Sequence, residues 1–307
     1  MPGMPDLTID PHVILIGRPP IRDFLGFIRV QAVDGQTADK GALIAEWRSA
    51  NEHLRAIERQ EAGCADNPAI EPLPDALIPH VEAVASTAAF RKSFGYFPTR
   101  FAMVNLDQLV VGQTHVNLAF ADQVKRSLGP SPTELDVLMK CIPLQQDVPQ
   151  ARVIQASVNS YSVVSPSSDL RFIEAALIDP AQIQGREYAG PPVAVVALVV
   201  GYGPNHLHVL NLEGRLILNN GSHRAYALRD MGIVKAPCIV QTLSTRDELE
   251  LVNETVQRHP DRYLSSARPP LFKDYFDPKL RKIVPVPRKN HVVKVSFGVD
   301  QTVIPAV

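Results

Sequence analysis

The spacing of hydrophobic residues indicates helices over the first 95 residues. Gly41–Gln60 places hydrophobic side chains three and four positions apart, which is the period of an amphipathic helix. A proline-rich connector, Pro68–Pro79, follows, and Pro79–Ser93 then returns to helical spacing. The pattern therefore predicts a mainly helical N-terminal region from residue 1 to 95.

Between residues 96 and 245, short apolar strands alternate with helices. Strands are expected at Phe101–Asn105 and Val153–Val164, and the valine-rich segment Val193–Val200 has the composition of a buried central strand. Helices are expected at Ala119–Leu128 and Asp169–Ala176, each followed by glycine or proline.

A β-hairpin and a helix are expected at the end of this region. The strands His206–Asn211 and Arg215–Asn219 flank a turn in which Gly214 is expected to adopt a positive φ. The helix Ser222–Met231 follows directly, and Gly232 is expected to terminate it.

Residues 246–307 are expected to form a C-terminal extension. It begins with a charged helix at Arg246–Arg258 and ends with a strand at Val293–Val299, in which apolar and polar side chains alternate. The whole pattern predicts an α/β fold of the α+β type with a mixed-sheet core.

Composition excludes several classes of protein. The 31 basic residues nearly balance the 32 acidic ones, so nucleic acid is not favoured as a partner, and contact with it would need a local patch such as Lys279–Lys282. The three cysteines are scattered without C-x-x-C spacing, which predicts neither a disulfide framework nor a cysteine zinc site.

The ends and apolar runs of the sequence favour a cytoplasmic location. The first residues carry Asp6 and Asp10 and lack the basic start of a signal peptide. The longest apolar run, Pro192–Val200, has about half the length of a membrane span. We therefore expect no membrane partner, while a homo-oligomer stays open.

The loop between the hairpin and its following helix has the composition of an anion-binding site. Gly221 permits a tight reversal, and the first turn of a helix presents N–H groups and partial positive charge. Asn220 and Ser222 flank this glycine, while His223 and Arg224 could donate hydrogen bonds or move a proton. In the alternative interpretation the loop is only a helix cap, with Arg224 paired to a carboxylate and His223 solvated.

This stretch resembles the ParB/sulfiredoxin superfamily. In that family a β-hairpin leads into a G-x-H-R or G-x-R-R loop, a helix, a glycine and a proline-containing strand. A second, shorter match lies at Val104–Leu109, with Gln113-Thr114-His115 where partition proteins often carry Gln-Pro-Arg. The resemblance implies a domain at 96–245 with an insertion at about 130–190. The residues that match the loop and its flanks are Gly221, His223, Arg224, Ala225, Ala227, Leu228, Gly232 and Pro237.

The resemblance implies that the loop binds a nucleotide or another phosphorylated or anionic small molecule. Known members include sulfiredoxins, CTP-dependent partition proteins, a few nucleases and small-molecule kinases acting on serine. Sulfiredoxins carry a cysteine where this chain has Ser222, so their sulfur chemistry is not expected here. The 60-odd residues after Gln241 are too few and too rich in proline for the helix-turn-helix of partition proteins.

The resemblance also suggests an enzyme of the phosphotransferase or nucleotide hydrolase type. The expected cofactor is ATP or another NTP with Mg²⁺, with His223 and Arg224 assisting catalysis. Asp107, Gln113 and His115 are the candidates on the substrate side, although Asp107 also suits a turn. Gln113 and His115 are not acidic, which weakens the comparison with the family kinases.

Two alternatives of other classes remain. One is a non-catalytic DNA-associated ParB-like regulator, against which the balanced charge counts. The other is a metal-dependent cupin-like enzyme, because His206 and His208 are two residues apart on an expected strand. Against that alternative, the two histidines could simply face solvent on the hairpin.

Overall fold

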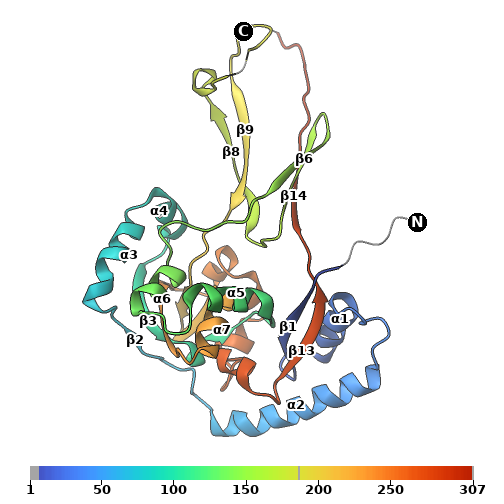
Figure 1. The fold of residues 1–307 in the computed structure, drawn as a ribbon, viewed down its shortest axis with the longest axis vertical. Helices are drawn as coiled ribbons and strands as arrows, with labels where there is room; N and C mark the ends of the chain where they lie inside the picture. The colour runs from blue at the N-terminus through green and yellow to red at the C-terminus, as the bar shows by residue number, and fades with distance from the viewer. Residues whose placement is uncertain (1–6, 186, 306–307) are drawn as a thin grey trace. The chain divides into compact units, whose positions relative to one another are not determined.

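The computed structural model describes residues 7–185 and 187–305, and it divides the chain into two units (Figure 1). The first unit comprises the residues up to Gln145 together with Asn205–Arg288, and the second comprises Gln146–Pro204 with the residues after Arg288. The boundaries expected near residues 95 and 245 both lie inside the first unit. Most of the expected insertion belongs to the second.

The first unit is built on a six-stranded mixed sheet with the order β2-β3-β12-β10-β11-β4. Its β10–β12 and β11–β4 pairs are parallel, and the other pairs are antiparallel. A mixed α/β architecture is thereby confirmed. The strands are β2 (Ile70–Glu71), β3 (Thr99–Asn105), β4 (Val110–Val111), β10 (His208–Leu212), β11 (Arg215–Asn220) and β12 (Lys235–Thr242).

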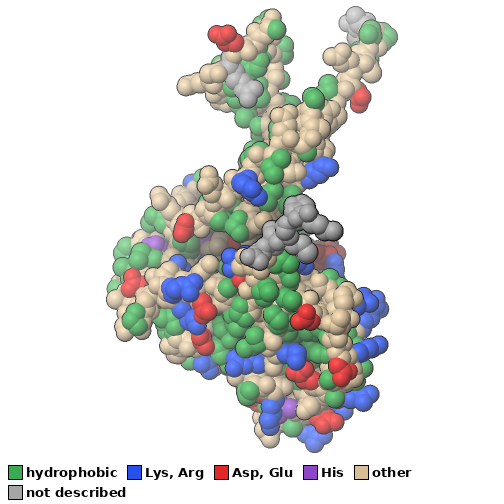
Figure 2. Space-filling model, turned by 45° about the vertical axis from the view of Figure 1, so that its right-hand side comes forward, with side chains coloured by type: hydrophobic (Ala, Val, Ile, Leu, Met, Phe, Trp, Pro, Cys, Tyr) green, Lys and Arg blue, Asp and Glu red, His purple; other side chains and the backbone are tan. Residues whose placement is uncertain are grey.

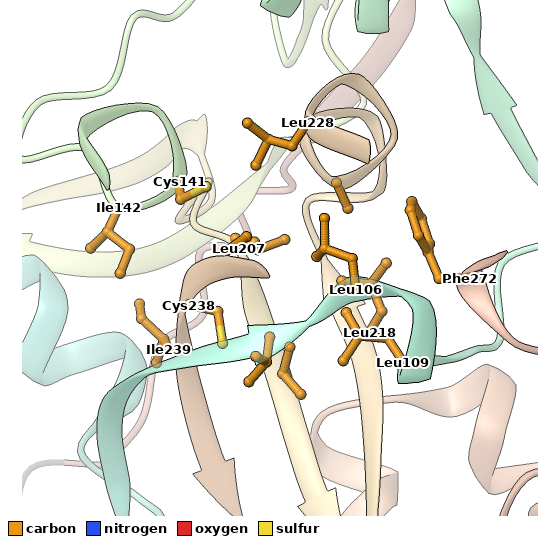
Figure 3. Close-up of a cluster of buried hydrophobic side chains, with 14 of the residues drawn as sticks. Leu106, Leu109, Cys141, Ile142, Leu207, Leu218, Leu228, Cys238, Ile239 and Phe272 are labelled. Atoms are coloured by element: carbon orange, nitrogen blue, oxygen red, sulfur yellow. The ribbon is translucent and has the colours of Figure 1, made fainter. Parts of the chain in front are cut away.

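The hydrophobic core lies between this sheet and three helices, α5 (Leu118–Leu128), α6 (Glu134–Cys141) and α7 (Ser222–Asp230). Seven of the eight residues of β12 are not exposed, as expected for a strand covered on both faces. Figure 3 shows side chains from β12, α7 and the segments around η2 (Leu106–Gln108) pointing toward one another. Helix α7 is buried along most of its length, so its direction is set by this core.

The expected hairpin and helix around Gly221 are confirmed. Strands β10 and β11 pair antiparallel, and their turn has φ of 50° at Glu213 and 73° at Gly214. Two consecutive positive φ values are the requirement of a type I′ turn. Gly221 has φ of 93° directly before α7, and Gly232 has φ of 86° after it.

The helices of the N-terminal residues are α1 (Ile21–Gln31), α2 (Lys40–Gln60), α3 (Ile78–Ala85) and α4 (Ala88–Phe94), with a 3₁₀ turn η1 (Asp75–Leu77). The long helix expected at Gly41–Gln60 is confirmed as α2. The single helix expected at Pro79–Ser93 is two helices, because the Thr87 side chain accepts a hydrogen bond from the Phe90 N–H and starts α4 anew.

A small three-stranded sheet joins segments that are far apart in the sequence. Strand β1 (Ile9–Leu15) pairs antiparallel with both β13 (Arg281–Pro287) and β5 (His115–Asn117). None of these three strands was expected, because β5 has three residues and β13 contains two prolines. The pairing with β13 over seven residues holds β1 in the first unit.

The second unit contains β-hairpins. The expected strand at Val153–Val164 is a hairpin of β6 (Arg152–Ser157) and β7 (Ser160–Ser165), and β7 also pairs with β14 (His291–Ser296), close to the expected closing strand. A separate hairpin pairs β8 (Leu170–Ile178) with β9 (Val195–Tyr202), and a 3₁₀ turn η3 (Pro180–Gln182) lies between them.

Two expectations in the second unit are wrong. Asp169–Ala176 is not a helix, because Leu170–Ile178 forms β8, where cross-strand pairing with β9 overrides local propensity. Val193–Val200 is not a buried central strand, because Val196 in β9 is 68% exposed and no other described strand pairs with β9 besides β8.

The charged helix expected at Arg246–Arg258 is interrupted. A 3₁₀ helix, η4 (Asp247–Leu251), is followed by the short α8 (Glu254–Gln257), and the Asn253 side chain caps α8 by accepting from the Val256 N–H. The first unit continues with α9 (Pro260–Leu264) and η5 (Phe272–Phe276). Across the described ranges, no helix combines the length and apolarity required to span a bilayer.

Candidate functional site

A cavity of about 540 Å³ lies at the N-terminus of α7 in the first unit. It brings together two segments that the sequence singled out separately, the loop after β11 and the segment Gln113–His115. The lining residues are Val111, Gly112, Gln113, Thr114, His115, Leu218, Asn219, Asn220, Ser222, Val252, Asn253, Glu254, Thr255, Phe272 and Tyr275.

Parallel pairing of β11 with β4 explains why these segments meet. Ile217 lies opposite Val110, and Leu218 lies opposite Val111, so both strands run toward the same sheet edge. The loop before α7 leaves the end of β11, and Gly112 follows the end of β4. Ligand sites in open sheets favour the carboxyl ends of parallel strands, which is where this cavity lies.

The loop geometry leaves the first turn of α7 directed at the cavity. Gly221 occupies the N-cap position with φ of 93°, and no side chain in the described part of the chain caps the helix. The Gly221 N–H donates to the Asn220 Oδ1 at 2.7 Å, which fixes the turn. Ser222 is the first residue of the helix, and it lines the cavity.

Two asparagines fix the wall beside this loop. Asn219 Nδ2 donates to His208 Nδ1 at 3.0 Å, and Asn219 Oδ1 accepts from Asn253 Nδ2 at 2.9 Å. The sequence interpretation missed Asn253, Glu254 and Thr255, which line the cavity from the start of α8. The sequence did contain a signal for this position. Asparagine favours the start of a helix, so Asn253 inside the expected charged helix indicates that a new helix begins there.

His115 also lines the cavity and lies in a partly buried cluster of aromatic rings. Its ring stacks on His12 with centroids 5.4 Å apart and contacts Phe27 at 5.1 Å. Burial lowers the pKa of His115, and burial lowers the pKa of His12 to about 4. His115 is therefore neutral near pH 7, with a ring nitrogen able to accept a proton.

Hydrogen bonds hold the segment that carries His115. Gln113 Nε2 donates to the His115 carbonyl oxygen at 2.7 Å, and the Tyr275 hydroxyl donates to the Gln113 carbonyl oxygen at 2.7 Å. The Gln113 side chain therefore has a structural partner within its own turn. Tyr275 is buried in η5 and ties that element to the cavity wall.

His223 and Arg224 lie behind the loop, and neither is among the described residues that line the cavity. The Arg224 guanidinium donates to the Asn205 carbonyl oxygen and, at 3.3 Å, to the Cys141 carbonyl oxygen. The His223 ring meets Phe120 edge-on at 5.5 Å, and burial lowers its pKa to about 4. Arg224 thereby holds the end of α6 against the segment that precedes β10.

Asp107 also lies apart from the cavity lining. Its carboxylate accepts from Arg229 Nε at 2.7 Å, and Asn105 Oδ1 accepts from the Asp107 N–H at 2.9 Å. The residue is the second of the 3₁₀ turn η2 and connects it to α7 through Arg229. These contacts match the turn that the sequence suggested for Asp107.

His206 and His208 are buried and do not face solvent on the hairpin. Both rings contact Phe94 edge-on, with centroids 5.6 Å and 5.2 Å away, and burial lowers both pKa values to about 4. Within residues 7–185 and 187–305, no group of three or more His, Cys, Asp or Glu side chains is arranged to hold a metal ion. The described residues therefore provide no third metal ligand beside His206 and His208, which a cupin-like metal site would require.

Among the described residues that line the cavity, Glu254 is the only one with a carboxylate. The same residues include no lysine or arginine. Glu254 Oε1 accepts from Arg258 Nη2 one helical turn later at 2.5 Å. Mg²⁺ is commonly held by one or two carboxylates together with ligand phosphates. The nearby amide oxygens Asn219 Oδ1 and Asn253 Oδ1 already accept hydrogen bonds, from Asn253 Nδ2 and the Val256 N–H, so Glu254 is the candidate metal ligand in this lining.

Comparison of the chain with protein-family models, with curated proteins and with solved structures finds no match in any of the three. The resemblance to the ParB/sulfiredoxin superfamily therefore rests on the loop sequence and its flanks.

The buried histidines predict a loss of stability in acid. A histidine with a pKa of about 4 when folded and 6.5 when unfolded takes up protons on unfolding, so its stabilising contribution is complete above pH 6.5 and decreases toward pH 4. We expect the free energy of unfolding to fall by up to about 1 kcal/mol for each such partly buried histidine from pH 7.5 to 5.5. Urea unfolding at both pH values measures this decrease.

The control for this pH effect is a histidine at the surface. His12→Leu should reduce the difference between the two pH values, whereas replacement of the exposed His291 by Asn should leave it unchanged. An equal difference in wild type and His12→Leu would contradict the assignment of the effect to His12.

Proposed function

We propose that the cavity binds a nucleotide or another phosphorylated small molecule, as its Mg²⁺ complex, in a domain of the ParB/sulfiredoxin-like type. The observation that supports this proposal is the opening of the α7 N-terminus into a cavity at the ends of parallel β4 and β11. Helix N-termini preceded by a glycine loop favour phosphate through backbone N–H groups and the helix dipole.

The proposed phosphate contacts are the first-turn N–H groups of α7, the Ser222 hydroxyl and the Asn220 side chain. Because the described lining residues include no cationic side chain, most of the ligand charge must be met by the helix and by the metal. Glu254 is the proposed protein ligand of Mg²⁺, which would neutralise charge on the phosphate oxygens.

The proposed reaction is phosphoryl transfer to water or to an alcohol. His115 is the proposed general base: its neutral ring accepts the proton of the nucleophile as the new O–P bond forms and the bond to the leaving group breaks. His223 and Arg224 are proposed to position the loop, in place of the catalytic assistance expected from sequence. In this proposal the proton is accepted by His115 and not by a residue of α7.

A DNA-associated role gains no support from the distribution of charge. In the basic stretch near the C-terminus, Lys282 pairs with Glu46 at 2.7 Å, and Arg288 pairs with Asp10 at 2.7 Å. Carboxylates thus already neutralise part of the patch that a phosphate backbone would need. Small-molecule binding is therefore the function that the geometry supports best.

Calorimetric titration with ATP, CTP and GTP in the presence of Mg²⁺ tests the binding proposal. We expect at least one nucleotide to bind, and Ser222→Ala and Asn220→Ala to weaken its affinity roughly tenfold, the effect of losing one or two hydrogen bonds to a charged group. The matched control is Ser127→Ala, because Ser127 is exposed on α5 and lies apart from the cavity lining. Absence of binding by all three nucleotides, or equal affinity in the two loop variants, would overturn the proposal.

The metal and base assignments have a separate test. Glu254→Gln should abolish the dependence of nucleotide affinity on Mg²⁺, whereas Glu250→Gln, on the neighbouring η4, should retain it. His115→Asn should keep nucleotide binding and lose turnover of the bound nucleotide. Full turnover in His115→Asn would exclude His115 as the base.

A further inference from the structure

A second cavity, of about 220 Å³, adjoins the cavity at α7. Gly112, Thr114 and Thr255 line both cavities, so the two meet along the segment after β4 and the start of α8. The Leu15 N–H donates to the Thr114 carbonyl oxygen at 2.8 Å, which ties this shared wall to β1. All the described residues that line the second cavity belong to the first unit.

The second cavity is lined by apolar side chains and by arginines. Pro20, Phe24 and Phe27 line it from α1 and the residue that caps this helix. Arg258 lines it from the end of α8, and Arg262 lines it from α9. The second cavity therefore combines an apolar surface with two guanidinium groups, whereas the described lining of the first cavity contains none.

The arginines give the second cavity a small positive charge. Asp23 is the one carboxylate among its described lining residues, and it stands in the first turn of α1, where the helix dipole stabilises it. With histidine counted as neutral, two guanidinium groups and one carboxylate leave one net positive charge. On the face drawn in Figure 2, the described basic side chains of the first unit lie among acidic ones, so this net charge is a local feature.

Both arginines keep donors for a ligand. Arg258 Nη2 donates to Glu254 Oε1 at 2.5 Å, and both side chains are largely exposed, so the pair is weak. Arg262 donates to the Arg18 carbonyl oxygen, and its guanidinium lies 5.7 Å from the centre of the Tyr263 ring. Because a guanidinium has five N–H donors, these contacts orient the two groups and leave further donors for an anion.

The apolar wall of the second cavity contacts two residues of interest outside it. The Phe27 ring lies 5.1 Å from the ring of His115, the proposed base in the first cavity. Pro19, which also lines the second cavity, accepts a hydrogen bond from Trp47 Nε1 at 2.9 Å through its carbonyl oxygen. Trp47 is the one tryptophan of the sequence, so its fluorescence reports on this wall.

We propose that the second cavity binds a small carboxylic acid with an apolar carbon skeleton. Its rings and prolines pack against the skeleton, and Arg258 and Arg262 bind the carboxylate, whose planar geometry a guanidinium matches. One carboxylate balances the net charge of the cavity, whereas a phosphate monoester carries nearly two negative charges at neutral pH. The volume is below the roughly 300–1,000 Å³ of sites for drug-sized ligands, which suits a small acid. This site does not depend on the function proposed for the first cavity.

Calorimetric titration of the full chain with phenylpropanoate, an aromatic acid with a single carboxylate, tests this site. We expect binding, and at least tenfold weaker binding of phenylpropanol, which lacks the charge, and of acetate, which lacks the apolar skeleton. Arg258→Gln and Arg262→Gln should each weaken the binding of phenylpropanoate roughly tenfold. Arg55→Gln, at an exposed arginine of α2 outside the described lining, should keep the wild-type affinity.

Tryptophan fluorescence of the wild type shows where the acid binds and does not depend on the folding of any variant. Phenylpropanoate should change the emission of Trp47 with the same midpoint that calorimetry gives, whereas acetate at the same concentration should not. Absence of binding, equal affinity for phenylpropanoate and phenylpropanol, or binding that leaves Trp47 emission unchanged would overturn the proposal. So would wild-type affinity in both arginine variants.

Discussion

Replacement of Asp274 by alanine is expected to lower the free energy of unfolding by about 3 kcal/mol, the lower end of the cost of removing one member of a buried ion pair, because Arg268 Nε keeps its contact with Glu61 at 3.0 Å. The Asp274 and Arg268 side chains are each only 2% exposed. Asp274 Oδ2 accepts from Arg268 Nη1 at 2.7 Å and from the Leu271 N–H at 3.0 Å. The alanine variant would leave both donors without this acceptor.

The effect should reach the cavity because of where the pair lies in the chain. Asp274 belongs to η5, whose Phe272 and Tyr275 line the cavity, and its contact with the Leu271 N–H starts that element. We therefore expect the variant to weaken the proposed nucleotide binding together with stability. Urea unfolding followed by circular dichroism measures the first effect, and calorimetry measures the second.

Two further variants distinguish the effect of burial on stability from the effect of charge alone. Asp261→Ala removes an 83% exposed carboxylate that also pairs with an arginine, Arg246, and should destabilise the protein far less than Asp274→Ala. The double variant R268M/D274L replaces both charges by apolar groups and should recover most of the lost stability. If Asp274→Ala and Asp261→Ala cost the same, the buried pair is not the stabilising contact that its geometry indicates.

Gly221→Ala is expected to lower the free energy of unfolding by about 2–4 kcal/mol, through a strained backbone and a steric clash together. Gly221 has φ of 93°, and a Cβ there would lie 2.8 Å from Leu207 Cδ1 and 3.1 Å from Leu207 Cα. Leu207 is fully buried in the main core, so the neighbouring backbone has little room to retreat.

Gly232 provides a matched control at the other end of α7. Its φ is 86°, but an added Cβ would meet nothing within 4 Å among the described residues. Gly232→Ala should therefore cost only the backbone strain, about 1 kcal/mol. Thermal or urea unfolding of the two variants measures the difference, and equal losses would show that the contact with Leu207 contributes nothing.

Local sequence predicted the hairpin, the Gly221 turn and α7 because each depends on neighbouring residues. A type I′ turn needs positive φ at adjacent positions, which Gly214 permits, and Gly221 and Gly232 mark the two ends of α7 in the local sequence. Helix α2 was predicted for the same reason, from hydrophobic side chains repeated at helical spacing.

Elements that depend on distant partners were missed. Strand β1 pairs with β13 across more than 260 residues, and β5 is a strand of three residues held by β1. In the second unit, Asp169–Ala176 was expected to be a helix, yet Leu170–Ile178 is a strand paired with Val195–Tyr202. Periodicity within a segment contains no information about which other segment it will meet.

For the candidate site, the sequence by itself determined the residue types and the loop conformation: Gly221 before a helix, with Asn220 and Ser222 beside it. The tertiary structure decided which residues share the cavity. Parallel pairing of β4 with β11 brings His115 to the loop, and the break at Asn253 brings Glu254 there. It also directs Arg224 toward backbone carbonyls behind the loop, because a buried guanidinium needs hydrogen-bond acceptors and the interior provides them.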